Sequence, residues 1–574
     1  MKKILSYCKP YTAFVALTLV IKTVGTLMDL VIPYLLGFIL DEVAPRCSKE
    51  NLLPIFLFGG LMVLCALIAV ITNIYANRRI SLFSKNVIET LRSDLFRKSL
   101  SLSSAQTDAF TVPSLVSRMS SDTYAVHHML NMAFRGGIRA PLLLIGGIGI
   151  TLFIEPALSL ILIVLLPLMA FVVTFISKRS IKLFRIKQKK VDKMVEKVRD
   201  TFTGIRVIKA LSKIDYEKNS FDTINKNLSH SEEIANFTTA ISPPSISILL
   251  NLGTTSVVAV GAVLVQNGHS TPGQIISFMS YFSIILNSTL MLTRIFNLFS
   301  RGAASADRIR EVLDAPKDLL CLPEKEVKDG AAFLEFENVT FSYNKKSPTV
   351  KDISFRLEKG QTLGIIGGTG SGKSTLIQLL LRFYDPDEGR ILLEGRDLRT
   401  IKPEDLKQKF GVVFQNDFLT ADTLKENILF TRDLSDENVE KGADCAMALP
   451  FITALEDGFE HLLTSKGQNL SGGQRQRVLI SRALAGDPEI LILDDASSAL
   501  DYKTDSLLRG ALKESYKSAT KIIVAQRISS IREADLILVL ENGEICGAGR
   551  DEDLTENCAI YREIATSQMG EMQI

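Results

Sequence analysis

Long apolar runs without charged residues fill the first three hundred positions and constrain the fold more than any other feature. Residues 52–77 and 156–177 carry no charge, and residues 234–293 hold only His269 as a residue that titrates near neutral pH. A helix needs about 20 apolar residues to cross the hydrocarbon core of a bilayer. The third run is therefore long enough for two membrane spans, joined by the turn-forming segment 266–273.

Two further spans bring the expected number to six. Residues 12–40 form one of them, interrupted by two charged side chains. Residues 140–154 are short for a span but lengthen backwards through 129–140, which includes Arg135 and Arg139. A porin-like barrel is excluded, because its strands would alternate in polarity at every second residue. We therefore expect an all-α transmembrane domain of six long helices embedded in the lipid bilayer.

The two charges inside the first span are Lys22 and Asp29. Seven residues separate them, which places both on one helix face about 10 Å apart along the axis, too far for direct pairing. Charges within a membrane usually face a cavity or a partner group. Two interpretations stay open, a structural contact to another helix and a contact with substrate in a cavity.

The distribution of basic residues predicts the orientation in the membrane. Six Lys or Arg residues lie in 78–98 and seven in 178–190, whereas the connections on the opposite side are poor in them. Basic loops stay on the cytoplasmic side. We therefore expect a multi-pass protein of the cytoplasmic membrane with both termini in the cytosol.

The chain has 574 residues, too many for one hydrophobic core, and its character changes after residue 301. We expect a transmembrane domain with cytosolic helix extensions at 1–302, a linker at 303–332, and a soluble α/β domain at 333–574. Lys and Arg number 66 against 63 Asp and Glu, so the total charge does not indicate a polyanionic partner.

A glycine-rich segment in the soluble domain follows an apolar strand and precedes a Leu-rich helix. It matches the phosphate-binding pattern G-x-x-x-x-G-K-[ST] in the strand–loop–helix context that this pattern requires. Its glycines let backbone N–H groups approach phosphates at a helix N-terminus, its lysine supplies a cation, and the following serine hydroxyl can ligate magnesium. The predicted nucleotide-binding residues are Gly367, Gly368, Thr369, Gly370, Ser371, Gly372, Lys373, Ser374 and Thr375.

A second motif supplies carboxylates. Residues 490–493 form an apolar run that ends in Asp494 and Asp495, typical of a buried parallel strand that delivers acids to its C-terminal end. Asp494 would hold Mg²⁺, directly or through water. Alone this motif is weak, but it gains weight beside the phosphate-binding loop.

Between these motifs the chain carries the sequence LSGGQ, the residues from Leu470 to Gln474. With it the chain resembles half of an ABC transporter over essentially its whole length, six spans followed by one ATP-binding cassette in the exporter order. The resemblance implies an α/β P-loop nucleotide-binding domain with a helical signature subdomain, and ATP and Mg²⁺ as cofactors. It also implies that the signature contacts the ATP held by a second half-transporter, through Ser471, Gly472, Gly473 and Gln474.

The same resemblance assigns further positions. Tyr343 matches the aromatic residue that stacks on adenine, and Gln415 matches the glutamine that senses magnesium and faces the membrane domain. Residues 498–501 match the loop that crosses the dimer. Short cytosolic helices that pass cassette closure to the membrane half would lie near 108–117 and within 205–221.

Two catalytic positions depart from the family pattern. Asp495 stands where a glutamate is usual, so the base is one methylene, about 1.5 Å, shorter. A displacement of about 1 Å can cost about a hundredfold in rate. Gln526 stands at the switch position, where histidine is usual, and an amide can donate a hydrogen bond but carries no titratable proton.

Together these departures resemble the degenerate half of a heterodimeric multidrug exporter, whose own site binds ATP more than it hydrolyses it. The expected cargo is a small hydrophobic or amphiphilic compound. The alternatives are a homodimeric lipid or peptide exporter and a nucleotide-gated regulatory membrane subunit. A soluble ABC protein that acts on nucleic acid is excluded by the six spans, so no nucleic-acid partner is expected.

Overall fold

The computed structural model describes residues 2–47, 52–323 and 330–569. The chain forms two compact units, one of residues 1–100 with 113–314 and one of residues 101–112 with 315–574. The first residues of the predicted linker, 303–332, form the C-terminal end of a long helix that runs to Leu313. Residues 324–329 of this linker lie outside the described part of the chain.

The first unit confirms the prediction of six long apolar helices. Within the described residues, six helical stretches are long and apolar enough to cross a membrane. Several are built from more than one helix. They are Lys3–Arg46, Leu53–Leu100, Val112–Ile154, Pro156–Thr203, Ile214–Gln266 and Pro272–Leu313.

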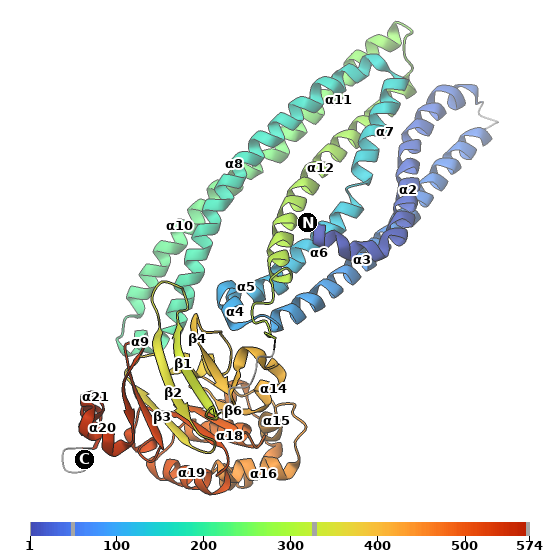
Figure 1. Cartoon of the computed structure of the whole chain (residues 1–574). Helices are drawn as coiled ribbons and strands as arrows, with labels where there is room; N and C mark the ends of the chain where they lie inside the picture. The colour runs from blue at the N-terminus through green and yellow to red at the C-terminus, as the bar shows by residue number, and fades with distance from the viewer. Residues whose placement is uncertain (1, 48–51, 324–329, 570–574) are drawn as a thin grey trace. The chain divides into compact units, whose positions relative to one another are not determined.

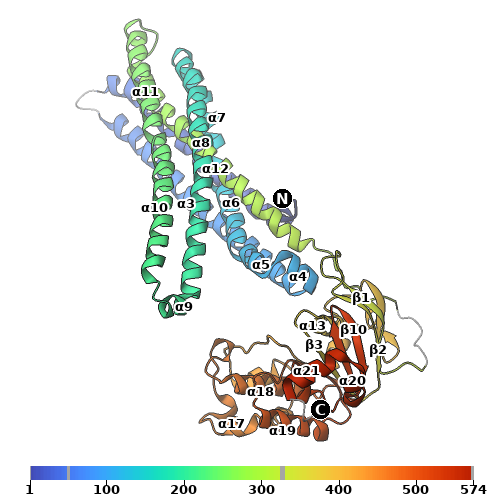
Figure 2. The same ribbon diagram turned by 90° about the vertical axis from the view of Figure 1, so that its left-hand side faces the viewer.

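The helices of this unit extend well beyond a bilayer thickness. Helix α8 (Pro156–Thr203) has 48 residues, about 72 Å at 1.5 Å per residue, against a hydrocarbon core of about 30 Å. It lies antiparallel beside α10 (Ile214–Ala240), and the short helix α9 (Ile205–Ala210) forms the turn between them (Figures 1 and 2). Helix α11 (Ser242–Gln266) continues this return path along α8.

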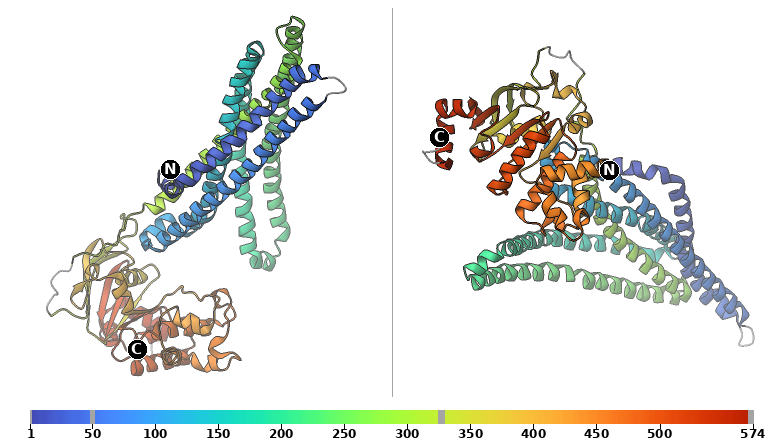
Figure 3. Two further views of the ribbon diagram at one scale, coloured as in Figure 1. Left: turned by 90° about the vertical axis from the view of Figure 1, so that its right-hand side faces the viewer. Right: turned by 90° about the horizontal axis from the view of Figure 1, so that it is seen from below.

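The third span is broken near its middle. Helix α6 (Thr123–Arg135) ends before a turn at Gly136, and α7 (Arg139–Ile154) resumes after it. Both helices pack against α12 (Pro272–Leu313). Helix α2 (Thr12–Phe38) packs on α3 (Leu53–Leu100), and Figure 3 shows these two helices side by side in blue. The backward extension through 129–140 is thus present, as two helices separated by a turn.

Both charges of the first span contact neighbouring helices. Lys22 is only 2% exposed, and its ammonium donates to the side-chain oxygen of Asn77 at 2.8 Å. Asp29 pairs with Arg139 at 2.9 Å. These contacts favour the structural interpretation of the two charges, because each already has a polar partner on another helix.

The second unit contains two sheets. Strands β1 (Leu334–Phe341), β2 (Val350–Leu357), β4 (Glu388–Leu393) and β5 (Arg396–Asp397) form an antiparallel sheet in the order β2-β1-β4-β5. The larger sheet has the order β10-β9-β3-β8-β7-β6 and is parallel except for the β9–β10 hairpin. Its strands are β3 (Thr362–Gly367), β6 (Phe410–Val413), β7 (Ile490–Asp494), β8 (Thr520–Val524), β9 (Leu536–Glu541) and β10 (Glu544–Gly549).

Parallel pairing brings the C-terminal ends of β3, β6, β7 and β8 to one edge of the sheet. Ligands bind at that edge in sheets of this kind. The phosphate-binding loop, Gln415, Asp495 and Gln526 follow these strand ends, so strand order gathers segments that are far apart in the sequence.

Helices complete the second unit. A group of helices gathers to one side of the strands around α18 (Gly472–Leu484) (Figure 3), and its apolar side chains pack in one cluster with residues of β6 and β7. The same unit contains α4 (Ser104–Phe110), α13 (Lys373–Leu380), α19 (Tyr502–Ser515), α20 (Asp551–Asn557) and α21 (Ala559–Met569).

Candidate functional site

The predicted phosphate-binding loop connects the end of β3 to the start of α13. Gly370 and Gly372 adopt φ angles of 82° and 99°, which side-chain-bearing residues rarely accept. A Cβ on Gly372 would lie 2.7 Å from a methyl carbon of Val350, so glycine is required there. On the outer side of the loop, a Cβ on Gly368 or Gly370 would meet nothing within 4 Å. The backbone is therefore open to a ligand.

Lys373, the first residue of α13, points back into the loop. Its ammonium donates to the carbonyl oxygens of Gly367 at 2.9 Å and Gly368 at 2.7 Å. Burial lowers the pKa of Lys373, and the nearby carboxylates of Asp494 and Asp495 act in the opposite direction. The cation thus lies near the loop and both acids, as the sequence motifs predict.

The residues around Asp494 fit a magnesium ion. Asp494 ends β7 and is 5% exposed. Burial raises the pKa of its carboxyl group, while a hydrogen bond from Ser374 lowers it and the charge of Asp495 raises it further. A hydroxyl and a carboxylate are hard oxygen donors, and Mg²⁺ in such sites takes one or two carboxylates together with water and phosphate oxygens. Within the described ranges no group of three or more His, Cys, Asp or Glu side chains could hold a metal ion.

Asp495 lies between two glutamines. The amide of Gln526 donates to its Oδ2 atom at 2.8 Å, and the amide of Gln415 approaches the same oxygen at 3.5 Å. Burial raises the pKa of Asp495, and the two glutamine hydrogen bonds lower it by less. Asp495 also adopts a φ of 53°, a region where aspartate is several-fold enriched over most side chains.

Tyr343 offers an aromatic surface beside the loop. It is 48% exposed, and its hydroxyl donates to Gln378 at 2.6 Å. The ring meets Phe341 and Tyr384 edge-on, with centroids 5.0 and 5.2 Å away. Two aromatic neighbours and a hydroxyl contact hold the ring, so an exposed part of it is presented for stacking.

The signature segment begins helix α18. The Ser471 hydroxyl accepts from the Gln474 backbone at 3.2 Å, and the Gln474 side chain accepts from the Ser471 backbone at 2.9 Å, a complete capping box. A Cβ on Gly473 would lie 3.3 Å from the carbonyl oxygen of Ala499, in the predicted crossing loop. Across the described residues, no hydrogen bond joins the signature to the phosphate-binding loop of the same chain.

Comparison with known proteins decides the family. A family model of the ABC transporter transmembrane region matches residues 15–289, and a model named ABC transporter matches residues 350–498. The ABC transporter ATP-binding protein YfiB of Bacillus subtilis (strain 168) is 31% identical over 577 residues, covering 99% of each chain. The chain belongs to the ABC transporter family.

Other similar proteins agree with this assignment. The ABC transporter ATP-binding protein Rv1273c of Mycobacterium tuberculosis (strain ATCC 25618 / H37Rv) is 32% identical and covers 98% of this chain and 97% of its own. A solved structure of a bacterial Atm1-family ABC exporter with ATP bound matches with a TM-score of 0.82 at 23% identity, covering 98% of this chain and 99% of that one. This likeness shows that the present ABC transporter chain has the exporter fold.

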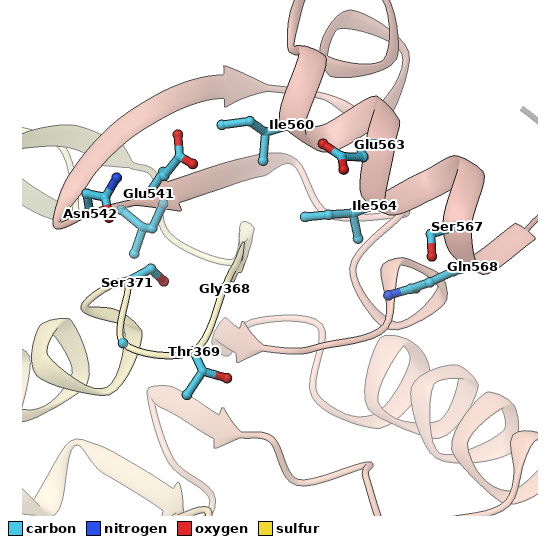
Figure 4. Close-up of a pocket in the computed structure, with 12 residues that line it drawn as sticks. Gly368, Thr369, Ser371, Glu541, Asn542, Ile560, Glu563, Ile564, Ser567 and Gln568 are labelled. Carbon is cyan, nitrogen blue, oxygen red and sulfur yellow. The ribbon is translucent and has the colours of Figure 1, made fainter.

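Two residues that no motif indicates also contact the site. Tyr384 touches the Tyr343 ring, and Gln568 in α21 bonds the backbone on both sides of Arg527. Figure 4 shows Gln568 at one end of a cavity of about 480 Å³ that lies between α21 and the phosphate-binding loop of this ABC transporter. Neither residue follows a strand end or belongs to a short pattern, so the sequence offers no signal for them.

Proposed function

We propose that this ABC transporter chain is the degenerate-site subunit of a heterodimeric exporter for hydrophobic or amphiphilic compounds. In this proposal the chain lies in the cytoplasmic membrane with both termini and the cassette in the cytosol. Its own site binds ATP and Mg²⁺ more than it hydrolyses ATP. The observation that carries the proposal is the pair formed by Asp495 and Gln526.

That pair is poorly suited to general-base catalysis. Gln526 places an amide donor 2.8 Å from the carboxylate oxygen of Asp495, and an amide cannot take up a proton at neutral pH. The carboxylate of aspartate also reaches about 1.5 Å less far from the backbone than that of a glutamate at the same position. A base must come within about 2.6–3.2 Å of the proton that it removes. Both features weaken hydrolysis and leave binding groups untouched.

The binding groups themselves support nucleotide retention. We assign Lys373 to the phosphates, Ser374 and Asp494 to magnesium with Gln415 beside them, and Tyr343 to the adenine. The first four residues lie at one edge of the parallel sheet, and the Tyr343 hydroxyl contacts Gln378 of α13, the helix that begins at this edge. Chemistry at the site would fall to the residues that depart from the family pattern, Asp495 and Gln526.

The signature supports a role toward a second half-transporter. Its capping box is complete, and Ser471 and Gly472 are exposed. In the proposed heterodimer this segment completes the partner's site, where most hydrolysis occurs. A heterodimer in which one site binds ATP and the other hydrolyses it requires a subunit whose own site is catalytically impaired but whose signature is intact.

The test compares ATP hydrolysis by the purified full-length chain, alone and with its candidate partner in lipid nanodiscs. Asp495→Asn in this chain and Glu→Gln at the partner's base position are the decisive variants. We expect Asp495→Asn to change turnover less than twofold, and the partner variant to abolish it. Asp433→Asn, which changes an exposed aspartate of the same cassette, is the matched control.

Brisk hydrolysis by the chain alone, abolished by Asp495→Asn, would contradict the proposal and favour a homodimeric lipid or peptide exporter. The substrate question needs vesicles that contain both chains. ATP-dependent accumulation of an amphiphilic dye supports export. Nucleotide binding without any transport, again with both chains present, would instead favour the regulatory membrane subunit.

A further inference from the structure

We propose that Gln568, in the C-terminal helix α21, is a positioning residue that holds the switch loop, residues 525–528, so that Gln526 meets Asp495. The inference rests on the proposed function only in taking Gln526 and Asp495 as the groups that set the rate of hydrolysis. It adds a role for α21, a helix to which no sequence motif assigns a function.

The Gln568 amide contacts the loop at two points. Its Nε2 donates to the carbonyl oxygen of Gln526 at 2.7 Å, and its Oε1 accepts from the backbone N–H of Ile528 at 2.9 Å. The two contacts lie on either side of Arg527, so one planar group spans the loop. A loop held at both flanks by one rigid amide loses most of its freedom to rotate.

The Gln526 side chain leaves this fixed backbone and reaches Asp495 at 2.8 Å. Two consecutive hydrogen bonds therefore connect α21 to the base position, one from Gln568 to the backbone of Gln526 and one from the Gln526 side chain to Asp495. The loop is also held at its start, where the Ala525 N–H donates to the carbonyl oxygen of Ile365 at 3.1 Å. Loss of the Gln568 contact would still free the Gln526 carbonyl group to shift, and such a shift would lengthen the contact with Asp495.

Helix α21 is firmly packed, which makes it a suitable support. Tyr561 is fully buried, and its hydroxyl donates to Asp551 at 2.7 Å. One apolar cluster joins Tyr561 and Ala565 of α21 with Ile366, just before the phosphate-binding loop, and with Ile528 of the switch loop. The helix thus packs against the start of the phosphate-binding loop and against the switch loop, and Gln568 adds hydrogen bonds to the switch loop.

The cavities around α21 show why that link matters. Figure 4 shows Thr369, Glu563 and Gln568 around the cavity of about 480 Å³ between the helix and the phosphate-binding loop. Gln568 also lines a neighbouring cavity of about 810 Å³ with Asp495, Gln526 and Arg527. Apolar packing holds Ile528, whereas the space on both sides of Gln568 leaves its amide to hold the carbonyl group of Gln526.

The experiment uses Gln568→Ala and Gln568→Glu in the full-length chain in nanodiscs. Ser567→Ala is the control, because it changes the neighbouring residue of α21 in the same cavity wall. Hydrogen exchange is measured over residues 523–530. We expect exchange at Ile528 to rise about fivefold or more in Gln568→Ala. It should stay near the parent value in Gln568→Glu, since a carboxylate still accepts from the Ile528 N–H, and in Ser567→Ala.

Catalysis is measured in a parent that carries Asp495→Glu and Gln526→His, where the proposed function predicts faster hydrolysis. Adding Gln568→Ala should lower kcat about tenfold and leave the KM for ATP within twofold, because misplacement of a catalytic group acts on the transition state. A purely structural role would raise exchange without this selective loss of kcat.

Unchanged exchange at 523–530 would overturn the inference, and so would raised exchange with unchanged kcat. If the doubly substituted parent hydrolyses ATP no faster than the natural chain, the explanation of the weak site fails. The positioning role of Gln568 is then decided by exchange at Ile528 alone. The failure of one proposal is thereby distinguishable from the failure of the other.

Discussion

The hydroxyl of Tyr384 donates a hydrogen bond to the carboxylate of Asp108, a residue of α4 that lies 276 positions earlier in the chain. Ser103 and Gln106, at the start of α4, bond Asp318 and the carbonyl oxygen of Pro316. Because Tyr384 also meets the ring of Tyr343 edge-on, α4 and the aromatic surface assigned to adenine belong to one continuous set of contacts.

Tyr384→Phe should loosen α4 while preserving the ring contact with Tyr343. A hydrogen bond to a charged group contributes about 1.5–3 kcal/mol, and partial exposure places this one at the lower end. We therefore expect hydrogen exchange across residues 101–112 to accelerate about tenfold. Tyr216→Phe, at an exposed tyrosine of α10, is the control; equal acceleration in both variants would refute the role of the Asp108 contact.

Tyr343→Ala should weaken ATP binding to the full-length chain. Stacking of a base on an aromatic side chain contributes about 1–3 kcal/mol, which corresponds to roughly 5-fold to 150-fold in Kd. Tyr343→Phe keeps the ring but loses the bond to Gln378, so its Kd should stay within about threefold of the parent. Equilibrium binding of labelled ATP measures both. Equal Kd values for the two variants would contradict stacking of adenine on the Tyr343 ring.

Asp494→Asn should stabilise the nucleotide-free chain. Burial raises the pKa of Asp494, so between the unfolded and folded pKa values the folded chain binds more protons than the unfolded chain. Stability from this group therefore falls as pH rises through the folded pKa, and at pH 7 the ionised carboxylate opposes folding. Replacement by asparagine should raise the melting temperature at pH 7.5, by about 2–4 °C for each kcal/mol relieved.

The same variant should lose the additional stabilisation that Mg²⁺ with ATP gives the parent chain. Thermal scans at pH 5 and pH 7.5 check both effects, and the gain should be smaller at pH 5. Asp433→Asn is the control for the removal of one negative charge. A lower melting temperature of Asp494→Asn at pH 7.5 would show that its hydrogen bond from Ser374 outweighs the cost of burial.

Asp29→Asn should destabilise the membrane unit, because it leaves Arg139 without its charged partner. The two side chains are 24% and 38% exposed, so we expect about 1–2 kcal/mol, less than for a fully buried pair. Adding Arg139→Gln should restore most of the loss. Asp215→Asn, which breaks the exposed pair with Lys218, should cost less than about 0.5 kcal/mol. Thermal aggregation in detergent ranks the three variants; no recovery in the double variant would contradict pairing.

Much of the fold follows from local pattern. Four of the six spans are predicted by uncharged apolar length alone, and the other two, 12–40 and 140–154, are predicted despite charged residues within them or directly before them. The gathering of Lys373, Asp494 and Gln526 follows from each lying at or just beyond the C-terminal end of an apolar strand, since parallel strands bring those ends to one edge. The break after Arg135 was accessible too, because two glycines follow it directly.

The remaining contacts depend on tertiary packing. Nothing near Tyr384 in the sequence indicates that its partner is Asp108, and nothing near Gln568 indicates two backbone contacts to the switch loop. The sequence likewise predicts that Lys22 needs a polar partner, but its identity as Asn77 depends on the packing of α2 against α3. Such pairings join distant segments through single side chains, and a single side chain produces no period or motif.

The contacts of Lys373 change what an affinity for nucleotide means here. Two carbonyl oxygens of its own loop already ligate its ammonium, so a phosphate competes with the protein for that cation. Binding is then an exchange reaction, and Kd reflects the difference between the free energy of the ammonium bound to the phosphate and that of the ammonium bound to the two carbonyl oxygens. A simple inorganic anion gains little from such an exchange. A polyphosphate also contacts the loop N–H groups and Ser374, and these contacts contribute more free energy than the loss of the two lysine–carbonyl bonds costs. The lysine therefore selects ligands by size as well as by charge.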